Sequence, residues 1–157
     1  MAAIDNIRND TGEVSSLLYV SKSLLRVPED LKLLDALVDT SRGRNLALSV
    51  TGALIFTELH FAQWLEGSRA ALDELMISIG RDDRHQNVRI VKNVDSVQRR
   101  FGGWSLAYWG TATFVDRLIS SVHRGEGSEQ ARAADIRRLE DIIYQFAMQG
   151  AGRTLGR

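Results

Sequence analysis

One glutamine stands out as a polar residue within an otherwise apolar stretch of the sequence. Residues 61–67 read FAQWLEG and alternate like a β-strand, which places Phe61, Gln63 and Leu65 on one face. A buried amide is costly unless its carbonyl oxygen and its N–H groups find partners. Gln63 is therefore satisfied either by neighbouring backbone or by other polar groups in the interior, and its chemistry is that of a hydrogen-bond donor and acceptor.

Three further side chains are expected to face the same interior layer as Gln63. Strand alternation places Tyr19 and Trp104 there, and Asn45 extends the inward stripe of a helix by one turn. Each has an ordinary structural explanation: Tyr19 as a core residue with its hydroxyl at the rim, Asn45 as a helix cap, and Trp104 as a packing residue. Together, however, they would all be paired by one planar heteroaromatic ligand with carbonyl and ring-nitrogen edges. Leu37 and Ile79 could then pack against its rings.

The elements that must position these residues alternate between strands and helices. The patterns predict strands over 16–21, 50–56, 61–67, 87–95 and 101–109, one helix that begins at Pro28, and a second that begins after a Ser68 N-cap. This order predicts an α+β fold, a ferredoxin-like βαββαββ sandwich with both helices on one face of the sheet.

The rest of the chain predicts two extra C-terminal helices. Residues 114–123 form a short amphipathic segment, and 129–149 carry a regular apolar stripe that could cover Ala62, Trp64 and Trp109 or pair with a second copy. The predicted organisation is a flexible N-terminal tail (1–15), one domain (16–110), a C-terminal helical cap (111–150) and a tail (151–157).

Composition narrows the possible functions. Lys plus Arg and Asp plus Glu both number 20, which gives no reason to expect nucleic acid or a membrane surface as a partner. The chain has no cysteine, its three histidines are far apart, and no apolar run approaches the roughly 20 residues of a membrane span. No dinucleotide-binding G-x-G-x-x-G and no P-loop are present. We therefore expect a cytoplasmic protein without a metal site.

Several short motifs follow one another over about residues 16–109: YVS (19–21), RN (44–45), VTGALI (50–55), FAQWLEG (61–67), RDDRH (81–85) and RFGGWSLA (100–107). In these motifs and in their order the sequence resembles the BLUF family, blue-light sensors that use flavin. The resemblance implies a short single-domain photoreceptor that is not itself an enzyme. It also implies FAD as the cofactor, with FMN possible, an unidentified downstream signalling protein as partner, and a homo-oligomer.

The resemblance also assigns roles to individual residues. It implies that Tyr19, Gln63 and Trp104 are photoactive, with Tyr19 donating an electron and a proton and the Gln63 amide switching its hydrogen bonds. The residues implied to bind the flavin are Tyr19, Leu37, Ser41, Arg44, Asn45, Leu54, Phe61, Gln63, Ile79, Asp82, Arg84, His85 and Leu106. Members often carry Met where this chain has Leu106, and Leu lacks the sulfur acceptor on which a Met-dependent signalling route would rely.

Two other functions fit the predicted fold. A ferredoxin-like domain could be a regulatory module that binds a colourless metabolite. It could also be an acylphosphatase-like hydrolase in which Lys22 and Arg26 cradle phosphate, although their loop lacks the glycines of a backbone nest.

Overall fold

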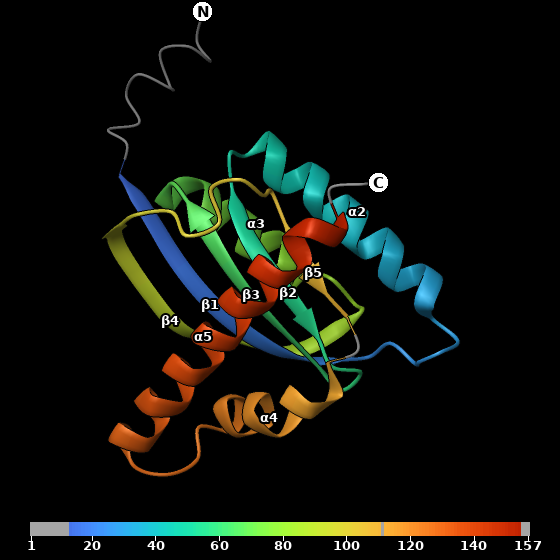
Figure 1. The fold of residues 1–157 in the computed structure, drawn as a ribbon, viewed down its shortest axis with the longest axis vertical. Coiled ribbons are helices and arrows are strands. Elements are labelled where there is room, and N and C mark those ends of the chain that lie inside the picture. Colours follow the sequence, from blue (N-terminus) through green and yellow to red (C-terminus); the bar gives the residue numbers. More distant parts are fainter. Residues whose placement is uncertain (1–12, 111, 155–157) are drawn as a thin grey trace, which may run out of the picture.

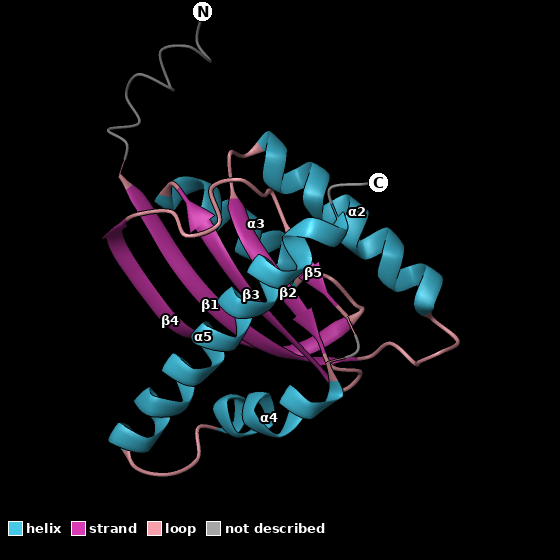
Figure 2. Ribbon diagram, in the orientation of Figure 1, coloured by secondary structure: helices cyan, strands magenta, loops and turns pink. Residues whose placement is uncertain are grey.

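A five-stranded mixed sheet forms the centre of the protein, with helices on both of its faces (Figure 1 and Figure 2). The computed structural model describes residues 13–110 and 112–154. The elements are β1 (Val14–Ser23), α2 (Leu31–Ala47), β2 (Thr51–Phe56), β3 (His60–Gly67), α3 (Arg69–Gly80), β4 (His85–Val97), β5 (Ala107–Trp109), the 3₁₀ helix η1 (Thr113–Val115), α4 (Asp116–Arg124) and α5 (Glu129–Thr154). The predicted α+β class and its two C-terminal helices are confirmed.

The strand order is β4-β1-β3-β2-β5, and every neighbouring pair is antiparallel except β2 and β5. Gln63 pairs with Tyr19 on one side and with Leu54 on the other. Directly opposite residues project to the same face of a sheet, so these three side chains form a row across the central strands. The alternation expected for residues 61–67 is therefore confirmed.

Each face of the sheet has its own apolar core. On one face, α2 packs through Leu34 and Val38, while α3 packs through Leu72 and Leu75. On the other face, Leu139 and Ile143 of α5 join a cluster that includes Ala62 and Trp64, and α5 crosses the strands diagonally (Figure 1). The C-terminal stripe thus covers the second face as predicted; the side chain of Trp109 lies outside the described part of the chain.

The first helix begins later than predicted. Residues 27–30 form turns, and α2 starts at Leu31, so Pro28 is not its first residue. The turn is closed by local hydrogen bonds: the Asp30 backbone N–H donates to the Arg26 carbonyl, and the Arg26 N–H donates to the Asp30 carboxylate at 2.7 Å. Asp30 therefore serves the turn and makes no side-chain cap on the helix.

The last strand is shorter than predicted, and the last helix is longer. Only Ala107–Trp109 forms β5, because residues before it make a turn in which the Trp104 N–H donates to the Phe101 carbonyl at 2.9 Å. Helix α5 continues through Gly150 to Thr154. Residues 1–12 of the predicted N-terminal tail lie outside the described residues. Within the described ranges, no helix combines the length and apolar character that crossing a membrane requires.

Candidate functional site

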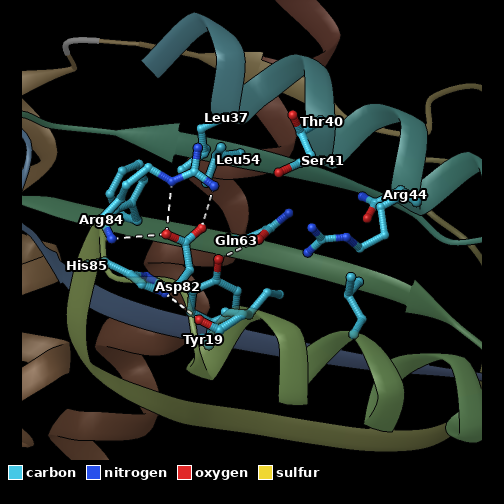
Figure 3. A pocket seen from close by; sticks show the side chains of 14 residues that line it. Tyr19, Leu37, Thr40, Ser41, Arg44, Leu54, Gln63, Asp82, Arg84 and His85 are labelled. Carbon is cyan, nitrogen blue, oxygen red and sulfur yellow. Dashed lines mark hydrogen bonds and ion pairs between the residues drawn. The ribbon is translucent and has the colours of Figure 1, made fainter. Parts of the chain in front are cut away.

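A pocket lies between the sheet and the helices α2 and α3 (Figure 3). It holds about 520 Å³ of space between atoms, counting the part that opens to solvent. Its lining residues are Tyr19, Leu37, Thr40, Ser41, Arg44, Asn45, Leu54, Phe61, Gln63, Leu75, Ile79, Asp82, Arg84 and His85. The pocket thus gathers residues from both helices, four strands and the loop after α3.

The structure brings together nearly all of the residues that the sequence singled out. Every predicted flavin contact except Leu106 lines the pocket, and two lining residues, Thr40 and Leu75, were missed. Leu75 belongs to the same stripe of α3 as Ile79, four residues later, so helical spacing could have identified it. Thr40 directly precedes Ser41, and nothing in its pattern marks it.

Trp104 does not lie in this layer, so that expectation is wrong. Its side chain packs against the cluster of Trp64 and Phe101 on the opposite face of the sheet. The cause is the turn at 101–104, which interrupts the strand alternation that placed Trp104 on the pocket side. Leu106 is buried with Leu54 and Phe61, behind the lining, and does not contact the pocket itself.

A short hydrogen bond between Tyr19 and Gln63 forms the floor of the pocket. The Tyr19 hydroxyl donates to Gln63 Oε1 at 2.5 Å, and both residues are at least 95% buried. Burial raises the pKa of the Tyr19 phenol well above its usual range, and the nearby Asp82 carboxylate raises it further, so the hydroxyl keeps its proton. The Gln63 amide nitrogen faces the pocket, where no acceptor from the described residues meets it (Figure 3).

Asn45 presents a second amide from the end of α2. Its Nδ2 donates to the Ser105 carbonyl at 2.8 Å, which ties the helix to the segment before β5. Its backbone carbonyl accepts from the Val50 N–H at 2.8 Å, so the residue is fixed at two points. The remaining acceptor, Oδ1, belongs to a residue that is only 1% exposed and lines the pocket.

Charged and aromatic groups close one end of the pocket. The Arg84 side chain donates two hydrogen bonds to the Asp82 carboxylate, from Nε to Oδ1 at 2.9 Å and from Nη2 to Oδ2 at 2.7 Å. These bonds, reinforced by the charge of Arg84, hold the pKa of Asp82 below its usual range. His85 is held at both ring nitrogens, by the Ser21 hydroxyl at 2.8 Å and the Ile79 carbonyl at 2.7 Å.

Arg44 supplies a cation without a recorded partner. Its side chain extends from α2 toward Gln63 (Figure 3), and no hydrogen bond or ion pair links it to another described residue. The pocket therefore offers neutral amide donors and acceptors on its floor, aliphatic walls, and a free guanidinium. This set fits a planar ring system with carbonyl and ring-nitrogen edges that also carries an anionic group. The described residues contain no group of three or more His, Cys, Asp or Glu suited to a metal ion.

Comparison with known proteins gives one consistent result. The model of the BLUF family, described as "Sensors of blue-light using FAD", matches residues 14–107. The blue light- and temperature-regulated antirepressor BluF of Escherichia coli (strain K12) is 33% identical over 89 residues, which are 57% of this chain and 22% of that protein. The photoactivated adenylate cyclase subunit beta of Euglena gracilis is 28% identical over 98 residues, 62% of this chain and 11% of the relative. This chain thus spans less than a quarter of either curated relative.

Solved structures agree with the sequence relatives. The dark-state structure of BlrB, a BLUF protein, is 32% identical, with a TM-score of 0.62 over 80% of this chain and 93% of BlrB. BlrP1 of Klebsiella pneumoniae, solved with FMN and cyclic diGMP, is 38% identical, with a TM-score of 0.55 over 62% of this chain and 26% of BlrP1.

Proposed function

Because this chain belongs to the BLUF family of blue-light sensors that use FAD, we propose that its pocket between β3 and the helices α2 and α3 binds flavin and detects blue light. The observation that carries the proposal is the buried Tyr19–Gln63 hydrogen bond with the Gln63 amide nitrogen directed into the pocket. FAD is the proposed cofactor, and FMN could make the same contacts with the floor of the pocket.

The lining residues divide the task of binding. Gln63 and Asn45 offer amide groups to the polar edge of the ring system, while Leu37, Leu54 and Ile79 provide apolar contact for its faces. Arg44 is placed to pair with an anionic group, because its charge has no hydrogen-bond or ion-pair partner among residues 13–110 and 112–154. Asp82 and Arg84 form the end of the pocket near His85. Their opposite charges pair with each other.

Two side chains carry the proposed light response. Bound flavin would supply the absorption of blue light and an excited ring that takes up an electron. Tyr19 is the donor of that electron and of its phenolic proton, and it holds this proton in the dark because burial disfavours the phenolate. Once the electron and the proton have returned to Tyr19, the Gln63 amide would remain with its donor and acceptor ends exchanged, since the two ends are nearly the same in shape. Each exchanged hydrogen bond is worth about 0.5–1.5 kcal/mol net, enough to bias a balanced equilibrium.

We further propose that the chain is a sensor module that signals to a partner protein through its C-terminal helices, and that it catalyses no reaction itself. The family match covers a sensor domain, and the relatives include an antirepressor and cyclase subunits. A homo-oligomer is part of this proposal, since Phe114 is 74% exposed on the cap and meets Phe146 of α5 in an edge-to-face contact, with ring centroids 5.6 Å apart. The absence of cysteine supports a cytoplasmic location.

The substitution Gln63→Leu tests the switch. We expect the variant to retain bound FAD, because leucine keeps the apolar contact area, and to lose the light-induced red shift, because leucine cannot exchange hydrogen bonds. Light-minus-dark absorption spectra of protein purified from a flavin-replete host measure both properties.

Gln145→Leu is the matched control, because Gln145 is exposed on α5 and should leave the spectra unchanged. A red shift of normal size in Gln63→Leu would refute the switch. Colourless wild-type protein that does not take up added FAD would instead refute the flavin site and favour a colourless metabolite.

A further inference from the structure

Helix α4 depends on its contacts for its structure. It has nine residues, Asp116–Arg124, and an isolated helix of this length is unstable in water. It packs Ile119 and Val122 into the core on the face of the sheet opposite the pocket. The position of α4 therefore depends on the few contacts that hold the helix on the sheet.

A buried polar contact holds the first turn of α4 on strand β3. His60 of β3 is 5% exposed, and its Nδ1 lies 2.8 Å from Oδ1 of Asp116, the first residue of the helix. The Thr57 hydroxyl donates to the same oxygen at 2.6 Å and accepts from the His60 backbone N–H at 3.1 Å. Because losing hydrogen bonds to a largely shielded carboxylate is costly, this anchor favours one position of the helix.

The other end of α4 is tied to a different strand by exposed contacts. His123 Nε2 lies 2.7 Å from the Asn87 carbonyl, and Arg89 Nη1 donates to the His123 carbonyl at 2.9 Å. Both contacts reach β4, at the edge of the sheet, and both are open to water. The anchor at His60 is thus more shielded from water than the contacts at His123, and it links α4 to the strand that carries Gln63.

We propose that the His60–Asp116 contact couples the docking of α4 to the hydrogen-bonding state of Gln63, which makes His60 a positioning residue of the light response. Phe61, the next residue of β3, lines the pocket, and Gln63 follows two positions later. Strand β3 is paired on both sides, and the register that sets Gln63 opposite Tyr19 sets His60 opposite Lys22. A shift of β3 when Gln63 changes partners therefore alters the geometry at His60. This inference rests on the proposed function.

Hydrogen exchange of α4 tests the coupling. Amide exchange of residues 116–124 is measured by mass spectrometry on the full chain loaded with FAD, in the dark and under blue light. We expect wild-type α4 to exchange faster in the light. In Asp116→Ala, we expect dark exchange to rise at least about tenfold, because hydrogen bonds to a charged group are lost, and the light-minus-dark difference to vanish. The red shift of the flavin should keep its wild-type size.

Two further variants separate coupling from simple loosening. Asp116→Asn keeps an oxygen that can accept from His60 and should restore part of the light-minus-dark difference. Asp135→Ala is the matched control. Asp135 lies on α5, and its carboxylate accepts a hydrogen bond from the Ser121 hydroxyl of α4 at 3.4 Å. The Asp135 side chain is shielded from water about as well as that of Asp116. This variant should leave the difference intact. Thr57→Val, which removes one donor to Asp116, serves if Asp116→Ala fails to fold.

Three outcomes overturn the coupling. These are a light-minus-dark difference that persists in Asp116→Ala, an equal loss in Asp135→Ala, and wild-type protein that shows the red shift without any change in α4. Wild-type protein without a red shift overturns the proposed function instead.

Discussion

At the scale of single residues, the pocket is defined by a phenol and an amide that satisfy only part of each other's hydrogen-bonding capacity. The hydroxyl of Tyr19 donates its one hydrogen bond to Gln63 Oε1. Gln63 keeps two donors on its nitrogen, and these face the pocket. A buried amide left in this state calls for an acceptor from outside the chain. The incomplete pairing, more than the pocket's size, is what identifies the site.

Replacing Tyr19 with phenylalanine should remove the photocycle, because a phenyl ring has no phenolic proton and is much harder to oxidise. It should also change the response to alkali. The folded protein holds the Tyr19 proton more tightly than the unfolded chain, so this residue's contribution to stability is fully present below pH 10 and is lost as pH rises above it. At pH 10.5 wild type should have lost about 1 kcal/mol through this group, and Tyr19→Phe should lack that part of the decline.

Tyr108→Phe provides the control for both measurements. Burial, with the charge of Asp35 as a smaller cause, raises the pKa of Tyr108 to about 12, yet this residue lies outside the pocket. Its replacement should lessen the alkaline decline and leave the photocycle unchanged. The measurements are urea denaturation at pH 8 and 10.5 and light-minus-dark spectra. A normal light state in Tyr19→Phe would contradict the role of Tyr19 as donor.

At the scale of elements, the sequence predicted strands better where alternation was unbroken. The row formed by Tyr19, Leu54 and Gln63 followed from period-two patterns, because each lies within a regular strand. The position of Trp104 could not be predicted in this way. Gly102 and Gly103 lie in a turn before it, and a turn breaks the period-two alternation from which the face of a later side chain is counted. The start of α2 was missed because a local turn closed by hydrogen bonds between Arg26 and Asp30 precedes the helix, and the helical spacing of the leucines does not reveal this turn.

Glu66 holds the loop that leads into β5. Its side chain is fully buried, and its carboxylate accepts from the backbone N–H groups of Arg100 at 2.6 Å and Phe101 at 2.9 Å, as well as from the Thr51 hydroxyl at 3.0 Å. In Glu66→Gln, an NH₂ group would face backbone donors, so we expect a loss of about 2–3 kcal/mol in the free energy of unfolding. Urea denaturation measures the change.

Glu74→Gln is the comparison for that measurement, because Glu74 is exposed on α3 and should change stability by less than about 0.5 kcal/mol. Equal stabilities for Glu66→Gln and wild type would show that the loop does not depend on the Glu66 carboxylate.

At the scale of the whole molecule, one sheet separates two environments. The face toward α2 and α3 contains the polar pocket, and the face toward α4 and α5 contains a larger apolar core (Figure 1). Arg100 lies over the rings of Trp64 at 5.1 Å and Tyr144 at 4.4 Å, joining the loop before β5 to α5. The sheet is therefore both the wall of the pocket and the platform of the cap. The segment before β5 also links the two faces, because Ser105 bonds to Asn45 on the pocket side and Trp104 packs on the other side.

Leu139→Ala tests how independent the two faces are at rest. Leu139 is fully buried between α5 and the sheet, so removing its side chain should cost about 2–5 kcal/mol of unfolding free energy. It shares no contact cluster with the residues that line the pocket, and distant sites without shared partners add within about 0.5 kcal/mol. The Kd for FAD in the dark should therefore stay within about twofold of wild type while the urea midpoint falls. Arg137→Ala, an exposed change on the same helix, should alter neither quantity. A large loss of FAD affinity in Leu139→Ala, measured where the variant is still folded, would mean that packing of the cap sets the geometry of the pocket even in the dark.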